Sequence, residues 1–347
     1  MDRRSFLRSS LAVPAAGAVA LAVESPARAG IATQTTLASG MTIPWGLDFL
    51  PDHSALVTER DSAQVFRILP YGAKQAVGSV PGVQHGGEGG LLGLAVSPTY
   101  AQDKRVYLYY TTASDNRVVW TTYDAGRLGT TFTPVVTGIP RGTIHNGGSL
   151  LFTSYGSLLV GCGETGNRAY SQNLGSLGGK ILQVTRDGRA WGSNPLVGRA
   201  GDDRILTWGH RNPQGLAQNT DGLLWSAELG QDTYDELNQI RGGRNYGWPN
   251  AEGSDGKGGY TDPLAQWTTA ECSPSGVACL GGRAWIGGLR GQALWSVDLG
   301  GARRGRKVRF LQGTYGRIRN VKKSWDGALW ITTSNGGSAD RVVRLAF

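Results

Sequence analysis

One pattern of apolar and polar residues recurs six times along this 347-residue chain. A typical copy begins with a glycine or small residue, continues through two or three apolar residues into a polar turn, and ends in an apolar strand. The copies begin at residues 46, 93, 148, 215, 283 and 321, and a third short apolar segment often follows. Alternating stretches joined by Asp-Gly-like or proline-containing turns are typical of antiparallel strands. Each copy therefore predicts a small antiparallel sheet.

The repeat favours a β-propeller. Residues 30–347 leave about 53 residues for each copy, a period typical of propeller blades. We expect an all-β, six-bladed β-propeller in a single domain, in which the last strand pairs with the segment after Gly30 to close the ring. The first four copies begin 47, 55 and 67 residues apart, so insertions between blades should build the binding loops. A pair of β-sandwiches is the rival fold.

The composition excludes several other classes of protein. The chain contains 54 glycines, and each glycine inside a helix costs about 1 kcal/mol relative to alanine, which argues against a helical bundle. The glycines lack the period of three that collagen requires. The net charge is +9, but the arginines are scattered and form no basic stripe with aromatic residues. No nucleic-acid partner is therefore predicted.

The first 29 residues have the pattern of an export signal. Arg3, Arg4 and Arg8 precede an apolar stretch at 11–23, and a small-residue site, Ala27-Arg28-Ala29, follows. The Arg3-Arg4 pair resembles a twin-arginine signal, and a general secretory signal is the alternative. No other apolar run approaches 18 residues, so no membrane span is predicted. We expect cleavage after residue 29 and a secreted or periplasmic protein.

Export makes disulfide bonds possible. Of the three cysteines, Cys272 and Cys279 flank a segment with Pro274 and Gly276 that reads as a turn, so we expect them to be bridged. Cys162 should then be a buried strand thiol. Without paired C-x-x-C motifs, the cysteines cannot form a zinc cage.

Three groups of polar residues lie between the predicted strands. His85, His145 and His210 belong to loops that should face the mouth of the central channel, where a histidine can accept a proton. The alternative for each is a structural hydrogen bond within its loop. The segment 228–240 carries Asp232, Asp235 and Glu236, whose oxygens suit Ca²⁺, although carboxylates of this kind are usually only solvated.

Arginines form the third group. They lie near blade entrances, at Arg211, Arg290, Arg317 and Arg319. Because Arg317 and Arg319 are two residues apart, they should share one face of a strand. Guanidinium groups bind carboxylates in a bidentate manner, so converging arginines beside calcium predict a polycarboxylate ligand. A role in surface solubility is the alternative.

Seven motifs in order carry a resemblance to a known family. They are GEGGLLGLA from Gly87, HNGG from His145, GETGN from Gly163, LGSLGGKIL from Leu174, GHRNPQGL from Gly209, ELGQDTYDELNQI from Glu228, and NYGWP from Asn245. Together they resemble the soluble pyrroloquinoline quinone (PQQ)-dependent sugar dehydrogenases, the glucose/sorbosone or aldose sugar dehydrogenase family. The resemblance covers about residues 40–347 and implies a six-bladed propeller.

The resemblance also implies roles for individual residues. His145 matches the catalytic base, which takes a proton from the anomeric hydroxyl of an aldose while a hydride passes to PQQ and a lactone forms. The residues that match cofactor-binding or pocket positions are Glu88, Glu164, Arg211, Asn212, Gln214, Arg290, Arg317 and Arg319. Carbonyls of Gly230 and Gln231 match ligands of a cofactor-side Ca²⁺. Asp235, Glu236 and the carbonyl of Tyr246 match a second, structural Ca²⁺ site.

The chain departs from the family pattern in four places. Gln231 stands where a proline is common, Ile144 precedes the histidine where the best-known relatives have aspartate, and Glu164 replaces a usual aspartate. The segment around Cys272 differs from an aromatic-rich stretch on the sugar side. The sugar is therefore the least determined feature, and the electron acceptor and the choice between monomer and homodimer stay open.

Two other functions compete with sugar oxidation. A calcium-dependent hydrolase such as a lactonase could use the same fold without an arginine cage. A non-catalytic binding module is the third possibility, because a propeller fold alone does not fix function.

Overall fold

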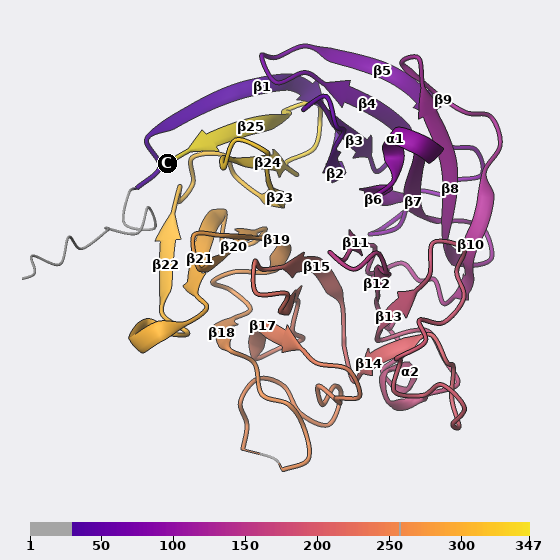
Figure 1. Ribbon diagram of the computed structural model, residues 1–347. Helices are drawn as coiled ribbons and strands as arrows, with labels where there is room; N and C mark the ends of the chain where they lie inside the picture. Colours follow the sequence, from indigo (N-terminus) through magenta and orange to yellow (C-terminus); the bar gives the residue numbers. More distant parts are fainter. Residues whose placement is uncertain (1–29, 257) are drawn as a thin grey trace, which may run out of the picture.

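The protein is a six-bladed β-propeller in the computed structural model, which describes residues 30–256 and 258–347. Its six sheets are arranged around a central axis, as Figure 1 shows. Within the described residues, each sheet has four strands except one, which has five. The all-β fold predicted from the repeat is confirmed. The predicted signal, residues 1–29, lies outside the described residues.

The first three blades follow one another along the chain. Each begins with its innermost strand and proceeds outward by antiparallel pairing. The first blade contains β2 (Pro44–Phe49), β3 (Ala55–Glu59), β4 (Gln64–Ile68) and β5 (Lys74–Ser79). The second contains β6 (Leu91–Val96), β7 (Arg105–Thr111), β8 (Asn116–Asp124), β9 (Arg127–Leu128) and β10 (Thr133–Ile139). The third contains β11 (Leu150–Phe152), β12 (Leu158–Cys162), β13 (Lys180–Val184) and β14 (Ile205–Trp208).

The other three blades repeat this order, and the last is completed by the first strand of the chain. The fourth contains β15 (Pro213–Gln218), β16 (Leu224–Glu228), β17 (Tyr234–Ile240) and β18 (Ala265–Thr268). The fifth contains β19 (Pro274–Leu280), β20 (Arg283–Gly288), β21 (Ala293–Asp298) and β22 (Lys307–Phe310). The sixth contains β23 (Ile318–Lys323), β24 (Leu329–Thr333), β25 (Asp340–Ala346) and β1 (Thr33–Met41). Short helical turns are α1 (Tyr100–Asp103), α2 (Ala169–Gln172) and the 3₁₀ turn Gly301–Arg303.

Pairing of β1 with β25 closes the ring. The two strands are antiparallel, with Thr33 opposite Ala346 and Thr35 opposite Arg344. A blade built from both ends of the chain ties the first and last sheets together by backbone hydrogen bonds, which confirms the predicted closure. Among the described residues, none of the helices has the length and apolar character that crossing a bilayer requires.

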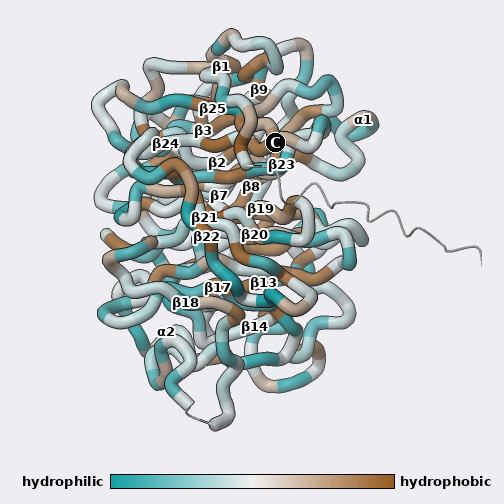
Figure 2. The backbone as a smooth tube through the Cα atoms, turned by 90° about the vertical axis from the view of Figure 1, so that its left-hand side faces the viewer, coloured by the Kyte–Doolittle hydropathy of each residue, from teal (hydrophilic) through white to brown (hydrophobic). Residues whose placement is uncertain are grey.

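The hydrophobic core lies between neighbouring blades. One cluster joins Tyr107 and Tyr109 of the second blade to Val160 and Leu182 of the third, and other clusters fill the remaining interfaces. Figure 2 shows that hydrophobic stretches follow the strands, whereas many connecting loops are hydrophilic. Each large apolar side chain buried in this way contributes about 1.5–3 kcal/mol. The alternation seen in the sequence therefore builds interfaces between sheets.

Glycines bring the innermost strands close together. A Cβ atom on Gly93 would lie 2.0 Å from the carbonyl oxygen of Gly148, and one on Gly215 would lie 2.2 Å from that of Ser275. Any larger residue would push neighbouring blades apart, which explains why glycine marks the start of so many repeats. The narrow channel along the axis is lined by these strands.

The strand positions predicted for the fifth repeat are wrong. The copy that begins at Arg283 forms β20 and β21, the second and third strands of its blade, rather than the first and second. The innermost strand is β19, which begins at Pro274. Its register shifts between Pro274 and Val277, and this irregularity accommodates the proline and Gly276 inside a strand.

The predicted bridge between Cys272 and Cys279 is wrong for the same reason. Both cysteines are free, and the residues between them form an extended strand rather than a turn. Strand residues advance about 3.3 Å each, so the ends of this segment are too far apart for a disulfide, whose Cα atoms lie within about 7 Å. Cys162 is a buried strand thiol, as expected.

Thiol titration should confirm this correction. Protein denatured without reductant is expected to release three reactive thiols per chain, because all three cysteines are free. A value of about one thiol would indicate a bridge. Protein reduced before denaturation gives the reference value.

Candidate active site

Four of the predicted site residues meet at one mouth of the propeller because they precede or begin innermost strands. Glu88 lies just before β6, His145 before β11 and Arg211 before β15, whereas Arg319 lies at the start of β23. These strands all begin at the same end of the ring. The fold therefore gathers residues that are up to 231 positions apart in the chain.

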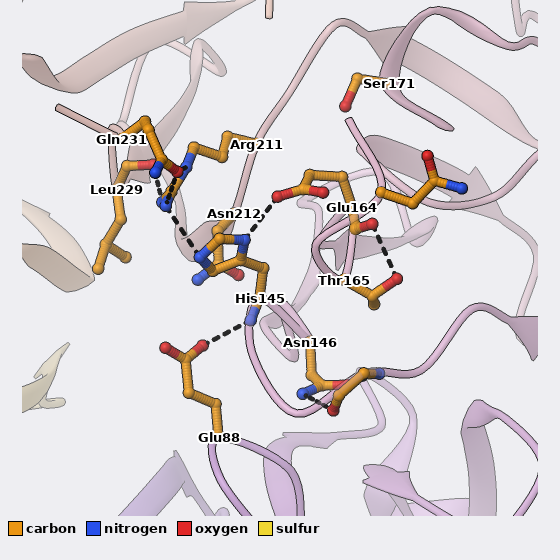
Figure 3. Close-up of polar contacts among 12 residues, drawn as sticks. Glu88, His145, Asn146, Glu164, Thr165, Ser171, Arg211, Asn212, Leu229 and Gln231 are labelled. Atoms are coloured by element: carbon orange, nitrogen blue, oxygen red, sulfur yellow. Dashed lines mark hydrogen bonds and ion pairs between the residues drawn. The ribbon is translucent and has the colours of Figure 1, made fainter. Parts of the chain in front are cut away.

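His145 is held on a tight turn. Its backbone has a φ of 53°, and its backbone N–H donates to Oε2 of Glu88 at 2.7 Å. The imidazole Nδ1 lies 2.5 Å from Oε1 of Glu164, a carboxylate that is almost completely buried. Figure 3 shows Glu88 and Glu164 on different sides of the histidine. A carboxylate at Nδ1 fixes the orientation of the ring and leaves Nε2 as the nitrogen that can accept a proton.

Arg211 occupies the other side of the imidazole. Its Nη2 lies 2.9 Å from Nε2 of His145, and it also donates to Oε1 of Gln231 at 2.7 Å. The Arg211 Nη1 donates to the carbonyl oxygen of Leu229 at 3.0 Å. Burial lowers the pKa of the Arg211 guanidinium, an effect that the surrounding glutamates oppose. Figure 3 shows this line of contacts from Gln231 through Arg211 to His145.

Arg319 is a buried cation without a carboxylate partner among the described residues. It donates to Oε1 of Gln214 at 2.7 Å and to Oγ of Ser275 at 3.3 Å. Its buried Nε has no hydrogen-bond partner among the described residues. Burial, together with the neighbouring Arg317 and Arg60 charges, lowers the pKa of Arg319 to about 9. A buried cation of this kind is costly unless an anion joins it. The arrangement therefore fits an anionic ligand.

Arg317 lies beside Arg319. Its Nε donates to the carbonyl oxygen of Ser334 at 3.1 Å, and Nη2 of Arg319 lies 3.4 Å from Oγ of the same serine. Arg317 is only partly buried, and burial also lowers the pKa of its guanidinium. The two predicted arginines therefore both contact Ser334, although Arg317 precedes β23 and does not share a strand face with Arg319 as the spacing predicted.

Comparison with known proteins identifies the family. A sequence profile of the Glucose / Sorbosone dehydrogenase family matches residues 41–344. The chain belongs to this family. It is 31% identical over 322 residues to the aldose sugar dehydrogenase YliI of Escherichia coli strain K12, a match that covers 84% of this chain and 86% of that protein.

Solved structures agree with this assignment to the glucose/sorbosone dehydrogenase family. The PQQ-bound aldose sugar dehydrogenase of Streptomyces coelicolor has 45% identity and a TM-score of 0.84, covering 90% of this chain and 97% of that chain. The apo-form of the soluble aldose sugar dehydrogenase of Escherichia coli has 27% identity and a TM-score of 0.82, covering 90% and 99% respectively. The family predicted from the seven motifs is thus confirmed.

The acidic loop of this family member is organised around backbone groups. Asp235 accepts from the backbone N–H groups of Gly230 at 3.0 Å and Ser273 at 2.7 Å. Oε1 of Glu252 accepts from the backbone N–H of Gln231 at 2.6 Å, and those of the next three residues lie within 3.3 Å. These carboxylates turn the N–H groups of the loop inward. No hydrogen bond from a described residue reaches the carbonyl oxygens of Gly230 and Gln231, so both could serve a cation.

The two carboxylates predicted for the second calcium site do not lie on the same side of their strand. Asp235 and Glu236 are neighbours on β17, so their side chains lie on opposite faces. Glu236 lines a small cavity with Glu228, Glu252 and Tyr246, and burial followed by the Glu228 charge raises its pKa. The described residues contain no group of three or more acidic, histidine or cysteine side chains that could hold a metal ion. Any cation there would depend on backbone carbonyls.

The remaining predicted residues differ from one another in burial and in hydrogen-bond partners. Oδ1 of Asn212 accepts from the backbone N–H of Gly147 at 3.0 Å, and its buried Nδ2 has no partner in the described chain. His210 is fully buried, with Nδ1 2.7 Å from Oε2 of Glu228 and Nε2 2.9 Å from Oγ1 of Thr207. These contacts agree with the alternative interpretation of His210, a structural hydrogen bond. His85 is exposed. Arg290 is also exposed and has no hydrogen bond or ion pair with another described residue, so the structure does not bring it into the network.

Three residues near the site were not identified from the sequence. Arg60 follows β3 and lies close enough to Arg319 to lower its pKa. Glu228, at the end of β16, accepts from the backbone N–H of Arg211 at 2.7 Å, and Glu252 organises the acidic loop. The position of Arg60 at a strand end of the repeat could have revealed it. Glu252 carries no local signal, because it lies in a long insertion before β18.

Proposed function

We propose that this protein oxidises aldose sugars at the anomeric carbon to lactones, with PQQ as the electron acceptor and His145 as the general base. The observation that carries the proposal is the position of His145 between Glu164 and Arg211, at the same mouth of the propeller as Arg319, a buried cation without a carboxylate partner among the described residues. The aldose sugar dehydrogenase of Streptomyces coelicolor was solved in a PQQ-bound form, which supports the choice of cofactor.

The residues present fit a quinone that carries carboxylates. Arg317 and Arg319 would hold carboxylate groups, and the unpartnered Nε of Arg319 and Nδ2 of Asn212 offer donors that the described residues leave unused. Arg211 and Gln214 would complete the binding surface, with Glu88 and Glu164 on the His145 side. When bound, PQQ supplies a carbonyl carbon that accepts a hydride. The exposed Arg290 remains a predicted ligand without a contact in support.

His145 would act on the sugar through Nε2. Nδ1–H of His145 donates a hydrogen bond to Glu164, so the lone pair lies on Nε2, where it would take the proton of the anomeric hydroxyl once Arg211 no longer contacts it. As that proton moves to Nε2, the buried Glu164 carboxylate stabilises the imidazolium that forms. The lactone results when the anomeric C–H bond gives up its hydride. A lactonase could also use a histidine base, but it would not need the arginine pair.

Calcium would bind next to the quinone. The carbonyls of Gly230 and Gln231 would hold it there, and Asp235 would position their loop through Gly230. Glu236 and the carbonyl of Tyr246 would contribute to a second, structural calcium, whereas Asp235, which the resemblance also assigns to that site, lies on the opposite face of β17. Hard oxygen donors of this kind suit Ca²⁺.

Export would place this single-domain propeller outside the cytoplasm. The basic and apolar pattern of residues 1–29 supports transport by the twin-arginine route to a periplasm or the outside medium. We expect the substrate to be a small sugar.

Reconstitution is the direct test of this function. Mature protein mixed with PQQ and Ca²⁺ is expected to change its quinone absorbance when an aldose is added, and to reduce an artificial dye. A parallel sample with EDTA should show little turnover, because calcium would orient the quinone. If no cofactor binds even after prolonged reconstitution, the proposal fails. If PQQ binds but no sugar changes its spectrum, the protein is a binding module.

The variant Glu164→Gln tests the orientation of the base. A neutral amide at this position stabilises an imidazolium less than a carboxylate does, so kcat should fall about 100-fold, the upper end of the range for residues that orient metal-bound histidines. PQQ affinity should change little, since Glu164 contacts the histidine rather than the arginines. Stopped-flow reduction of the bound quinone would measure the chemical step. An unchanged rate would mean that Glu164 has only a structural role.

A further inference from the structure

The side chain of Gln231 holds Arg211 against the proposed base. Its Oε1 accepts from Nη2 of Arg211 at 2.7 Å and from Nε at 3.1 Å. The Leu229 carbonyl oxygen accepts from Nη1, so one edge of the guanidinium is fixed by this loop. The Nη2 group also reaches Nε2 of His145 at 2.9 Å. Gln231 and His145 therefore share one arginine, as Figure 3 shows.

This contact covers the nitrogen that the reaction would need. Arginine has only donors, so Nε2 of His145 must accept from Arg211 while Nδ1 donates to Glu164. Nε2 has a single lone pair in the ring plane, and a sugar hydroxyl that gives its proton to His145 needs the same lone pair. Arg211 must therefore move away from Nε2 before the base can act.

We propose that Gln231 is a positioning residue, which through Arg211 covers Nε2 of His145 in the cofactor-free protein. The inference deepens the proposed function, because a covered Nε2 matters only if His145 is the base. An anionic group that arrives beside Arg211 is a stronger acceptor than the neutral amide of Gln231. Cofactor binding would thus draw the guanidinium away and uncover the base only when an electron acceptor is present.

The loop that carries Gln231 is fixed independently of its side chain. The Gln231 backbone N–H donates to Glu252 at 2.6 Å, and Asp235 binds the N–H groups of Gly230 and Ser273. Replacement of the Gln231 side chain should therefore leave the loop backbone in place. This makes the contact with Arg211 accessible to mutation.

Acylation by diethyl pyrocarbonate tests the proposal without quinone, calcium or sugar. The reagent attacks an imidazole nitrogen that has a free lone pair, and peptide mass spectrometry gives the rate for each histidine. In Gln231→Ala, His145 should react about five-fold faster than in the wild type, since the hydrogen bonds to Gln231 are lost. In Gln231→Glu, a carboxylate holds Arg211 more firmly, so His145 should react more slowly than in the wild type.

A double-mutant comparison separates positioning from general loosening. Arg211→Ala should expose His145 at least as much as Gln231→Ala, and the double variant should react no faster than Arg211→Ala alone. The fully buried His210 serves as an internal reporter of folding, and the exposed His53 reports reagent activity. A role of Gln231 limited to stability would give additive rates and no slowing in Gln231→Glu.

Two results would overturn the proposal. One is a wild-type rate for His145 in Gln231→Ala while Arg211→Ala exposes it, and the other is an unchanged rate in Arg211→Ala. If His210 becomes reactive in Gln231→Ala, that variant has unfolded, and the rate in Gln231→Glu then decides. Since the assay contains neither cofactor nor substrate, its failure would leave the sugar oxidation assay unaffected, and the two proposals can fail separately.

Discussion

Replacement of His145 by glutamine is expected to lower kcat for sugar oxidation by about 10²–10⁴, the usual contribution of a general base. Glutamine has a similar size and can still hydrogen-bond, but it cannot take a proton from the anomeric hydroxyl. The arginines that would bind PQQ are unchanged, so the quinone affinity should stay within a few-fold of the wild type. Titration with PQQ and single-turnover reduction of the bound quinone would measure the two effects separately.

The control for this variant is His53→Gln. His53 is an exposed histidine between β2 and β3, stacked on Trp325 with ring centroids 4.2 Å apart. It should keep wild-type kcat and quinone affinity. If the His145 variant retained more than about a tenth of the wild-type rate, the base would have to be another residue. A non-catalytic binding module would keep its binding in both variants.

The fold could be predicted from the sequence because its signal is local and repeated. Strand alternation recurs along the chain and glycines lie at most of the innermost strands, where Gly93 and Gly215 mark positions at which a side chain has no room. Pro274 and Gly276 broke this logic. The two residues predict a turn, whereas a register irregularity accommodates them within β19. The mistaken turn shifted the predicted fifth repeat by one strand and led to the wrong prediction of a disulfide bond.

The site could be predicted only in part, because its contacts join distant segments. The motifs located His145 and Arg211, the family resemblance added Arg319, and the fold brings their strand ends together. The sequence did not indicate that Gln231 would use its side chain rather than only its carbonyl, nor that Glu252 would bind four consecutive backbone N–H groups of the acidic loop. Side-chain direction in loops has no period, so Arg290 could not be distinguished from the arginines of the site.

Replacement of Arg319 by methionine should weaken PQQ binding while leaving the cofactor-free protein at least as stable. Two charge-assisted hydrogen bonds to a carboxylate contribute about 1.5–3 kcal/mol each, so quinone affinity should fall at least about 100-fold. In the absence of an anion, Arg319 is a buried charge without a carboxylate partner among the described residues, and its pKa is lowered to about 9. Methionine has a similar length and no charge, so it removes the cost of burying that charge.

Thermal unfolding with and without PQQ would measure both effects in one experiment. The wild type should gain stability from PQQ and Ca²⁺, because a ligand that binds only the folded state raises the free energy of unfolding. Arg319→Met should begin at an equal or higher midpoint without ligand and gain much less when PQQ is added. The exposed Arg306, replaced by methionine, is the matched control and should behave like the wild type. A large loss of stability in cofactor-free Arg319→Met would mean that the arginine stabilises the fold, and a calcium-dependent hydrolase would then be the better explanation of the site if hydrolysis survived.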